Sequence, residues 1–236
     1  EYPVDANGAK MMLLAQINFT DAALEDERLP KHGMLQFFIW ADVDSGYECL
    51  YGVDSEEPDT QKNWRVIYHE EIDRTVTQEQ ILQIGMPTSA TADEENTPVY
   101  KEAAVKIEKT MAYMFLDDYQ FGDILEQTLK ELFGNDIREK YAFDYHSDKN
   151  EDYFYDAFFP EGNRLLGYPV CTQPQLQPRA HMDKKTRNYY DTLLFQMDSD
   201  EDYVMWGDGG AANFFINSEA LKNCDFSRVW YYWDCT

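Results

Sequence analysis

Basic residues are scarce in this chain. Its 236 residues include 20 lysines and arginines against 45 aspartates and glutamates, which gives a formal net charge of −25. A protein that binds nucleic acid needs a basic face to neutralise phosphates, and anionic membrane surfaces attract basic segments for the same reason. The composition therefore argues against nucleic-acid and membrane partners. It leaves a basic protein partner, cations or plain solubility as the meaning of the charge.

Long apolar runs and dense cysteine patterns are also missing. No stretch approaches the roughly 18 apolar residues of a membrane span. The four cysteines form no CxxC pair, so free, mostly buried thiols in a cytoplasmic protein are the simplest interpretation, with two disulfides left open. No signal peptide is visible, but the chain does not start with methionine, so a preceding segment stays open.

Three landmarks occur twice in the same order: a Leu-Leu-x-Gln hexapeptide, a glycine-led heptapeptide ending in Phe-Phe-Ile, and Tyr-Pro-Val. The copies lie at Leu13–Asn18 and Leu193–Asp198, Gly33–Ile39 and Gly210–Ile216, and Tyr2–Val4 and Tyr168–Val170. The period is too long for a solenoid repeat of about 20–50 residues. We interpret the chain as a single domain, residues 1–236, with duplicated halves seeded at about 2–44 and 168–220.

Alternation of apolar and polar residues predicts strands, and in both hexapeptides the odd-numbered residues should face a core. The predicted strands are 13–19, 35–40, 47–53, 64–70, 103–116, 193–198 and 212–217, although a helix would also suit 103–116. A capping box predicts a helix at 77–84, and an apolar stripe predicts another within 122–135, where Asp123 can cap the helix and Gly134 ends it. Without regular βαβ alternation, these elements predict an α+β fold with mostly antiparallel sheets and a few helices.

Motifs along nearly the whole chain carry a family resemblance. They are LLAQINF, GMLQFF, LLGYPV followed by Gln173, LLFQMDSD, MWGDGGAANFFI and DFSRVWYYWDC. Together they resemble the YwqG-like family, a bacterial domain of unknown function. The resemblance implies one α+β domain with an internal duplication and no established activity. Some relatives look associated with toxin–immunity gene neighbourhoods, which implies a protein-binding role by association.

Candidate catalytic and zinc motifs are incomplete. In His69–Asp73 an aspartate replaces the second histidine of the zincin motif, and the preceding strand pattern would separate the two side chains. Pairs such as Cys171 and His181 carry no signature of an activated nucleophile. We therefore expect no catalytic residue, no metal and no cofactor.

The glycine-rich loop around Trp206 is the first binding candidate. Its glycines permit close backbone approach, so Trp206 and Asp208, with Asp198 and Asp200 nearby, could meet a basic protein partner. The alternative is that the indole fills the core and the aspartates cap turns. The loop lacks the glycine and glutamate of an EF-hand, but an irregular calcium site stays open.

Four amide side chains are the second candidate, because Gln16, Gln196, Gln36 and Asn213 occupy matching places on the less apolar strand faces. Buried amides need hydrogen-bond partners, so these either clamp neighbouring backbone or line a cleft at the seam between the halves. The charge favours a non-enzymatic module that binds a basic partner, and the resemblance implies a toxin-immunity-like form of it. An enzyme or small-molecule-binding protein with a seam cleft is the alternative. The sequence does not indicate the oligomeric state.

Overall fold

A computed structural model describes residues 1–22, 24–41, 51–54, 56–92, 97–115, 118–134, 152, 161–173 and 182–236. In this part of the chain, antiparallel strands and short helices alternate irregularly along the sequence, which confirms the α+β class. The predicted strand at 47–53 lies mainly outside the described residues. Its described end is not a strand, because Tyr51 and Gly52 form a helical turn.

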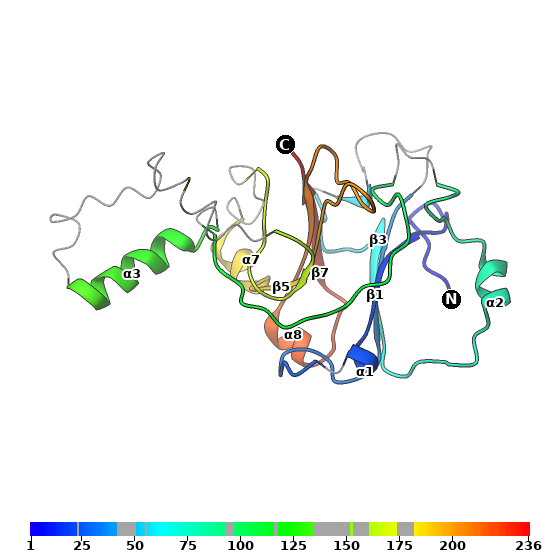
Figure 1. Ribbon diagram of the computed structural model, residues 1–236, viewed down its shortest axis with the longest axis horizontal. Helices are drawn as coiled ribbons and strands as arrows, with labels where there is room; N and C mark the ends of the chain where they lie inside the picture. The colour runs from blue at the N-terminus through cyan, green and yellow to red at the C-terminus, as the bar shows by residue number, and fades with distance from the viewer. Residues whose placement is uncertain are drawn as a thin grey trace.

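Two antiparallel sheets face each other (Figure 1). The first sheet has the strand order β1 (Met12–Asn18), β2 (Met34–Ile39) and β3 (Trp64–His69). The second has the order β4 (Arg164–Leu165), β5 (Thr192–Asp198), β6 (Ala211–Ile216) and β7 (Val229–Asp234). Successive strands are neighbours in both sheets, which is the simplest connectivity for antiparallel pairs.

Aromatic side chains fill the space between the sheets. The ring centroid of Phe37 in β2 lies 4.7 Å from that of Phe195 in β5 and 4.9 Å from that of Phe214 in β6. The Trp64 ring in β3 lies 5.6 Å from the Tyr231 ring in β7. All five side chains are buried in one core that both sheets share. Burial of this apolar surface holds the two sheets together.

Strand pairing follows the same register in both sheets. Gln16 lies opposite Gln36 in the first sheet, as Gln196 lies opposite Asn213 in the second. We call residues matched by this register counterparts: they are 12–18 and 192–198, 34–39 and 211–216, and 64–69 and 229–234. The match agrees with the interpretation of duplicated halves, which stays an interpretation.

A bulge in each sheet moves the expected core face. The pairing shifts after Leu13 in β1 and after Leu193 in β5. Leu14 and Leu194 therefore enter the shared core, whereas Leu13 and Leu193 turn to the opposite face of their sheets. The prediction that the odd-numbered residues face a core is wrong for Leu13, because the extra residue changes the alternation. Leu193 does face a core, but it is the separate cluster on the outer face of its sheet.

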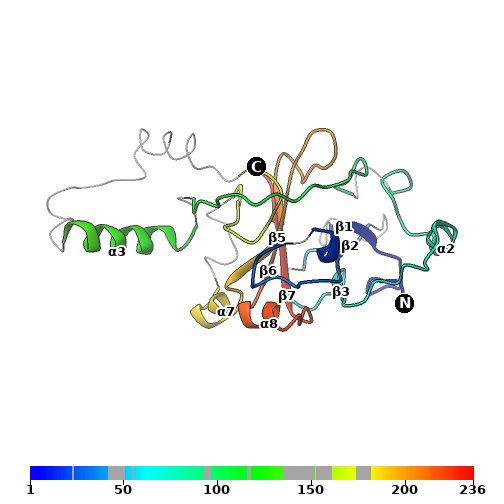
Figure 2. The ribbon, with the colours of Figure 1, turned by 60° about the horizontal axis from the view of Figure 1, so that its bottom comes forward.

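Short helices surround the sheets in the described part of the chain. They are α1 (Phe19–Ala22), α2 (Gln78–Ile84), α3 (Phe121–Phe133), α7 (Lys184–Tyr189) and α8 (Ser218–Lys222). Figures 1 and 2 both place the first sheet between the second sheet and α2, with α3 projecting on the far side. One face of the first sheet therefore meets the core, and its other face lies on the side of α2.

The two predicted helices form, with one correction. The side chain of Thr77 accepts from the Gln80 N–H and that of Gln80 accepts from the Thr77 N–H, so the capping box of α2 is present. Helix α3 begins at Phe121, three residues before Ile124, the first helical position after a cap at Asp123. Asp123 therefore lies in the first turn, where its charge favours the helix dipole without capping it.

The predicted strand at 103–116 does not form in the described residues. Residues 103–115 have no regular secondary structure and cross one side of the sandwich (Figure 1). Ala112 packs closely on Gly167: a Cβ added to Gly167 would lie 2.9 Å from the Ala112 Cβ. Upstream, Tyr100 donates its N–H to the Tyr203 carbonyl. Ile107 packs against the shared core, but within the described residues no strand pairs with residues 103–115, and a strand requires such pairing.

Candidate functional site

Trp206 is buried completely, with 0% exposure. Its indole lies against Tyr51 and Trp233, with ring centroids 5.4 Å and 6.2 Å away. The glycines of the loop allow this packing: a Cβ on Gly207 would lie 2.6 Å from the Cys235 sulfur. The hypothesis that Trp206 anchors a partner requires an exposed indole, so burial removes that anchor. The alternative, an indole that fills the core, describes this residue.

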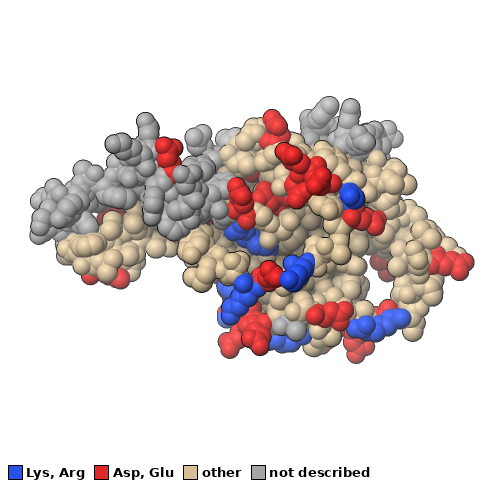
Figure 3. Space-filling view, viewed as in Figure 1, with Lys and Arg blue, Asp and Glu red and all other residues tan. Residues whose placement is uncertain are grey.

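Two aspartates of this region, Asp198 and Asp200, accept hydrogen bonds from main-chain N–H groups. The carboxylate of Asp198 accepts from the N–H groups of Gly162 (2.6 Å) and Ser199 (2.9 Å), and that of Asp200 accepts from the Asp202 N–H. Such bonds are typical of turn capping. Asp200, Glu201, Asp202 and Asp208 are exposed. In Figure 3, red side chains gather in the upper middle of the molecule, where Figure 1 places this loop.

The amides of the second sheet hold a neighbouring segment. Oε1 of Gln196 accepts from the Val170 N–H at 2.8 Å, while Nδ2 of Asn213 donates to the Val170 carbonyl at 2.9 Å. Nε2 of Gln196 also donates to the Gly162 carbonyl. Both amides are 0% exposed. We call this arrangement, in which two amides hold both main-chain groups of one residue, the main-chain clamp.

A carboxylate extends the contact with this segment. Asp234 of β7 accepts from the N–H and hydroxyl of Thr172, each at 3.1 Å, and from the N–H of Gln173 at 3.1 Å. Burial raises the pKa of the Asp234 carboxyl, and these hydrogen bonds oppose that shift. The segment from Val170 to Gln173 therefore crosses from β5 and β6 to β7 while side chains of the sheet satisfy its backbone.

The counterparts in the first sheet form a polar stripe that we define as Gln16, Gln36 and His69. Nε2 of Gln36 donates to Oε1 of Gln16 at 3.1 Å, and Nε2 of His69 lies 3.1 Å from Oε1 of Gln36. Gln16 and His69 are exposed and Gln36 is partly exposed. These side chains satisfy one another instead of a chain segment.

The outer faces of the two sheets differ in burial, although their strands correspond. The outer face of the first sheet consists of Leu13, Gln16, Asn18, Met34, Gln36, Phe38, Arg65, Ile67 and His69, of which only Phe38 is buried. The counterparts are Leu193, Gln196, Asp198, Ala211, Asn213, Phe215, Trp230, Tyr232 and Asp234, of which all but Asp198 and Tyr232 are buried. A polar, open face on a packed sheet is a candidate binding surface.

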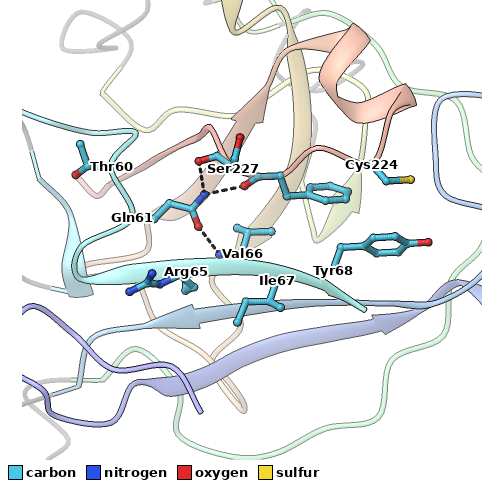
Figure 4. A pocket seen from close by; sticks show the side chains of 9 residues that line it. Thr60, Gln61, Arg65, Val66, Ile67, Tyr68, Cys224 and Ser227 are labelled. Carbon is cyan, nitrogen blue, oxygen red and sulfur yellow. Dashed lines mark hydrogen bonds between the residues drawn. The ribbon is translucent and has the colours of Figure 1, made fainter. Parts of the chain in front are cut away.

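The seam between the sheets offers no cleft among the described residues, because the aromatic core fills it. An open groove of about 390 Å³ lies instead where β3 meets the turn before β7 (Figure 4). Within it, Oε1 of Gln61 accepts from the Val66 N–H at 2.8 Å, and Nε2 donates to the Phe226 carbonyl at 2.8 Å. The Gln61 side chain thus takes the place of an added strand and protects the edge of β3.

Metal and thiol chemistry find little support in the described residues. No group of three histidine, cysteine or acidic side chains there could hold a metal ion. Cys171, Cys224 and Cys235 form no disulfide, and Cys171 is buried, while Cys49 and His181 lie outside the described residues. None of the helices in the described part of the chain has the length and apolar character that a membrane crossing requires.

Sequence reasoning found the four amides but missed their neighbours. His69 drew attention only as part of an incomplete metal motif, and Asp234 lies in the aromatic stretch VWYYWD, whose strand β7 was not predicted. The only signal that could have joined them is register, because His69 and Asp234 end strands that correspond in the two sheets, β3 and β7. Gln61 carries no sequence signal, since its role depends on contacts with residues 165 and 166 positions away.

A family model described as "Domain of unknown function (DUF1963)" matches residues 1–235. The chain therefore belongs to this family. No curated protein matches the chain. The match agrees with the expectation of a family without an assigned activity, and the finer YwqG-like name stays a prediction.

Proposed function

We propose that this DUF1963 protein is a non-enzymatic interaction module that binds an extended, basic segment of a partner protein on the outer face of its first sheet. One observation carries the proposal. The polar stripe of Gln16, Gln36 and His69 lies open, whereas its counterparts in the second sheet hold a segment of the chain itself. A frame that holds an extended segment in one sheet is suited to hold another in its counterpart.

The aromatic core supports an interaction module over the enzyme with a seam cleft. Catalytic and small-molecule sites are usually concave pockets with a few convergent polar groups. Here the seam contains Phe37, Phe214 and Trp64 in ring contact. The groove beside β3 is crossed by the hydrogen bonds of Gln61. Recognition across an open sheet face needs neither a seam cleft nor a deep pocket.

Charge supports a basic partner. The chain has a formal net charge of −25, and Asp21, Glu70 and Glu71 are exposed next to the ends of β1 and β3. Complementary charge mainly raises the rate of association and is screened by salt. A toxin-immunity-like role is one form that such binding could take, and that form rests on the family resemblance alone.

Site-specific photo-crosslinking tests the proposed surface. A photoreactive phenylalanine analogue replaces Ile67, a partly exposed outer-face residue, or Leu132 on the exposed side of α3 as the matched control. We expect Ile67 variants in the native host cell to cross-link to a partner that Leu132 variants do not capture. Mass spectrometry of the cross-linked peptide then identifies the partner segment.

Binding of the isolated partner segment to the purified chain then tests the cross-linking result. The identified segment, synthesised as a peptide, should bind the purified full chain, and its dissociation constant should rise at least about threefold between 50 mM and 200 mM salt. A cross-linked segment that fails to bind as a peptide, or identical cross-links from Leu132, would overturn the proposed surface. Binding that salt leaves unchanged would overturn the basic character of the partner.

A further inference from the structure

Two atoms of the first sheet occupy the positions that clamp a residue in the second. In the clamp, the acceptor is Oε1 of Gln196 and the donor is Nδ2 of Asn213, and Val170 lies between them. Their counterparts are Oε1 of Gln16 and Nε2 of Gln36. These two atoms are hydrogen-bonded to each other at 3.1 Å.

We infer that the Gln16–Gln36 hydrogen bond is the closed form of a second main-chain clamp, which opens to hold both main-chain groups of one extended residue of a partner. This inference rests on the proposed function, because it names the atoms of that surface. In the open form, Oε1 of Gln16 accepts the partner N–H and Nε2 of Gln36 donates to the partner carbonyl.

The exchange of hydrogen bonds favours opening when a peptide is present. Opening breaks one amide–amide bond, between the exposed Gln16 and the partly exposed Gln36, and forms two bonds to the peptide. Each such bond contributes a modest net free energy in water, because the unbound groups are hydrated. The clamp therefore fixes register and direction, and the side chains that flank the clamped residue supply most of the affinity.

The second sheet also fixes the direction of the partner segment. Val170 lies over β5 and β6, and Thr172 and Gln173 follow toward Asp234 of β7. The counterpart of Asp234 is His69. The partner chain should thus run from Gln16 and Gln36 toward His69, where it meets an imidazole instead of a carboxylate. A peptide held in the first sheet therefore keeps the contacts of the clamp and loses those that the Asp234 carboxylate makes to the N–H groups after the clamped residue.

The chain supplies its own probe. A capped peptide with the sequence of residues 168–173, with serine in place of Cys171, copies the segment that Gln196 and Asn213 hold in the second sheet and is offered in trans to the full chain. The matched probe is the same peptide with an N-methyl group on its valine, which removes the N–H that Gln16 would accept. Binding of the first peptide is expected with a dissociation constant on the order of 1 mM.

Nuclear magnetic resonance with ¹⁵N-labelled protein reads the site directly. We expect the side-chain amide signals of Gln16 and Gln36 to shift with the unmodified peptide. N-methylation should weaken binding about five- to tenfold, and so should Gln16→Leu. On the Gln16→Leu background, N-methylation should have no further effect, because the two changes remove the same hydrogen bond. Gln127→Leu, an exposed glutamine on α3, is the control and should bind normally.

The outcomes separate the inference from the proposed function. If the peptide causes no shift, or if N-methylation weakens binding equally in Gln16→Leu and in the unmodified chain, the clamp is wrong. If the outer-face signals shift but neither N-methylation nor Gln16→Leu weakens binding, the clamp is wrong while the surface stands. If the titrations behave as expected but photo-crosslinking at Ile67 yields no partner segment, the clamp stands and the proposed function fails.

Discussion

The two sheets share one strand frame but differ in what covers their outer faces. Both have the same register and the same bulge. The second sheet carries a further hydrophobic cluster of Leu193, Phe215, Trp230 and Tyr190 on its outer face. On the first sheet, Phe38 has one ring partner among the described residues, the partly exposed Tyr2, with centroids 5.7 Å apart. The arrangement of the strands therefore does not determine whether the outer face of a sheet is buried. The segments that cover the face determine it.

This difference determines which outer-face residues are needed for folding and which are available to a partner. The second sheet is packed on both faces, so its outer residues contribute to folding. The first sheet is packed mainly on its inner face, so its outer polar residues are free to serve another purpose without loss of the core. The predictions that follow test whether the two faces differ in energy as they differ in burial.

The largest effect should come from the outer-face phenylalanines. Phe215→Ala should lower the free energy of unfolding by about 3–5 kcal/mol, because its ring stacks on Trp230 at 5.2 Å inside a closed cluster. Phe38→Ala should cost at least about 1 kcal/mol less, since the partly exposed Tyr2 can move into the space. Urea unfolding followed by tryptophan fluorescence measures both. Equal losses would show that the two outer covers are equivalent.

Periodicity predicted β1 and β5, but it also predicted a strand at 103–116 that does not form in the described residues, and it gave no signal for β7. The hexapeptides of β1 and β5 alternate, so they were recognised. Strand β7 does not alternate because Trp230 and Tyr231 are buried on opposite faces of the sheet. The bulge that moves Leu13 out of the core also left no signal, because two successive leucines suit either alternation.

The candidate site was predictable only in part. The amides were noticed because they repeat, but the sequence could not tell that Gln196 is fully buried and Gln16 exposed. That difference depends on a segment beginning 34 residues before Gln196, which covers one sheet and not the other. The sequence also could not tell whether Trp206 is exposed or buried, because glycines that permit an exposed loop also permit close packing.

Two glutamines provide the most closely matched comparison. Gln196→Leu should destabilise the fold by about 1–3 kcal/mol, because the Val170 N–H and the Gly162 carbonyl lose their buried partners. Gln16→Leu should change stability by no more than about 0.5 kcal/mol, since its side chain is exposed. Thermal and urea unfolding measure both. A loss of more than about 1 kcal/mol in Gln16→Leu would mean that the first sheet needs its polar stripe for folding.

Alkaline pH should weaken the second sheet through Tyr231, whose counterpart in the first sheet is Val66. Burial raises the pKa of the Tyr231 phenol well above 10.0. A raised pKa means that the folded state favours the neutral phenol. This contribution is complete below pH 10, and it is lost as the pH rises through the folded-state pKa, at about 1.4 kcal/mol per pH unit.

Paired unfolding curves at pH 9, 10 and 11 isolate the Tyr231 contribution. Tyr231→Phe should cost about 1 kcal/mol at pH 9, because its hydroxyl donates to the Tyr51 carbonyl at 3.1 Å. It should then lose stability less steeply than the unmodified chain above pH 10. Parallel curves for the two proteins would show that the phenol does not stay neutral in the folded state.

The smallest effect on stability should come from the helix caps, and it should differ between α8, beside the second sheet, and α2, beside the first. The Asn217 side chain caps α8 by accepting from the N–H groups of Glu219 and Ala220, and α8 places Leu221 in the shared core. Asn217→Ala should therefore lower global stability by about 1 kcal/mol.

The corresponding change on the side of the first sheet is Thr77→Ala. It removes the capping box of α2, a helix with no buried residue, so global stability should change by less than about 0.5 kcal/mol. Hydrogen exchange of the α2 amides should instead accelerate about fivefold, because α2 can open while the core stays folded. If Thr77→Ala lowers global stability as much as Asn217→Ala does, α2 is part of the cover of the first sheet. Its outer face would then be less available to a partner than its exposed side chains indicate.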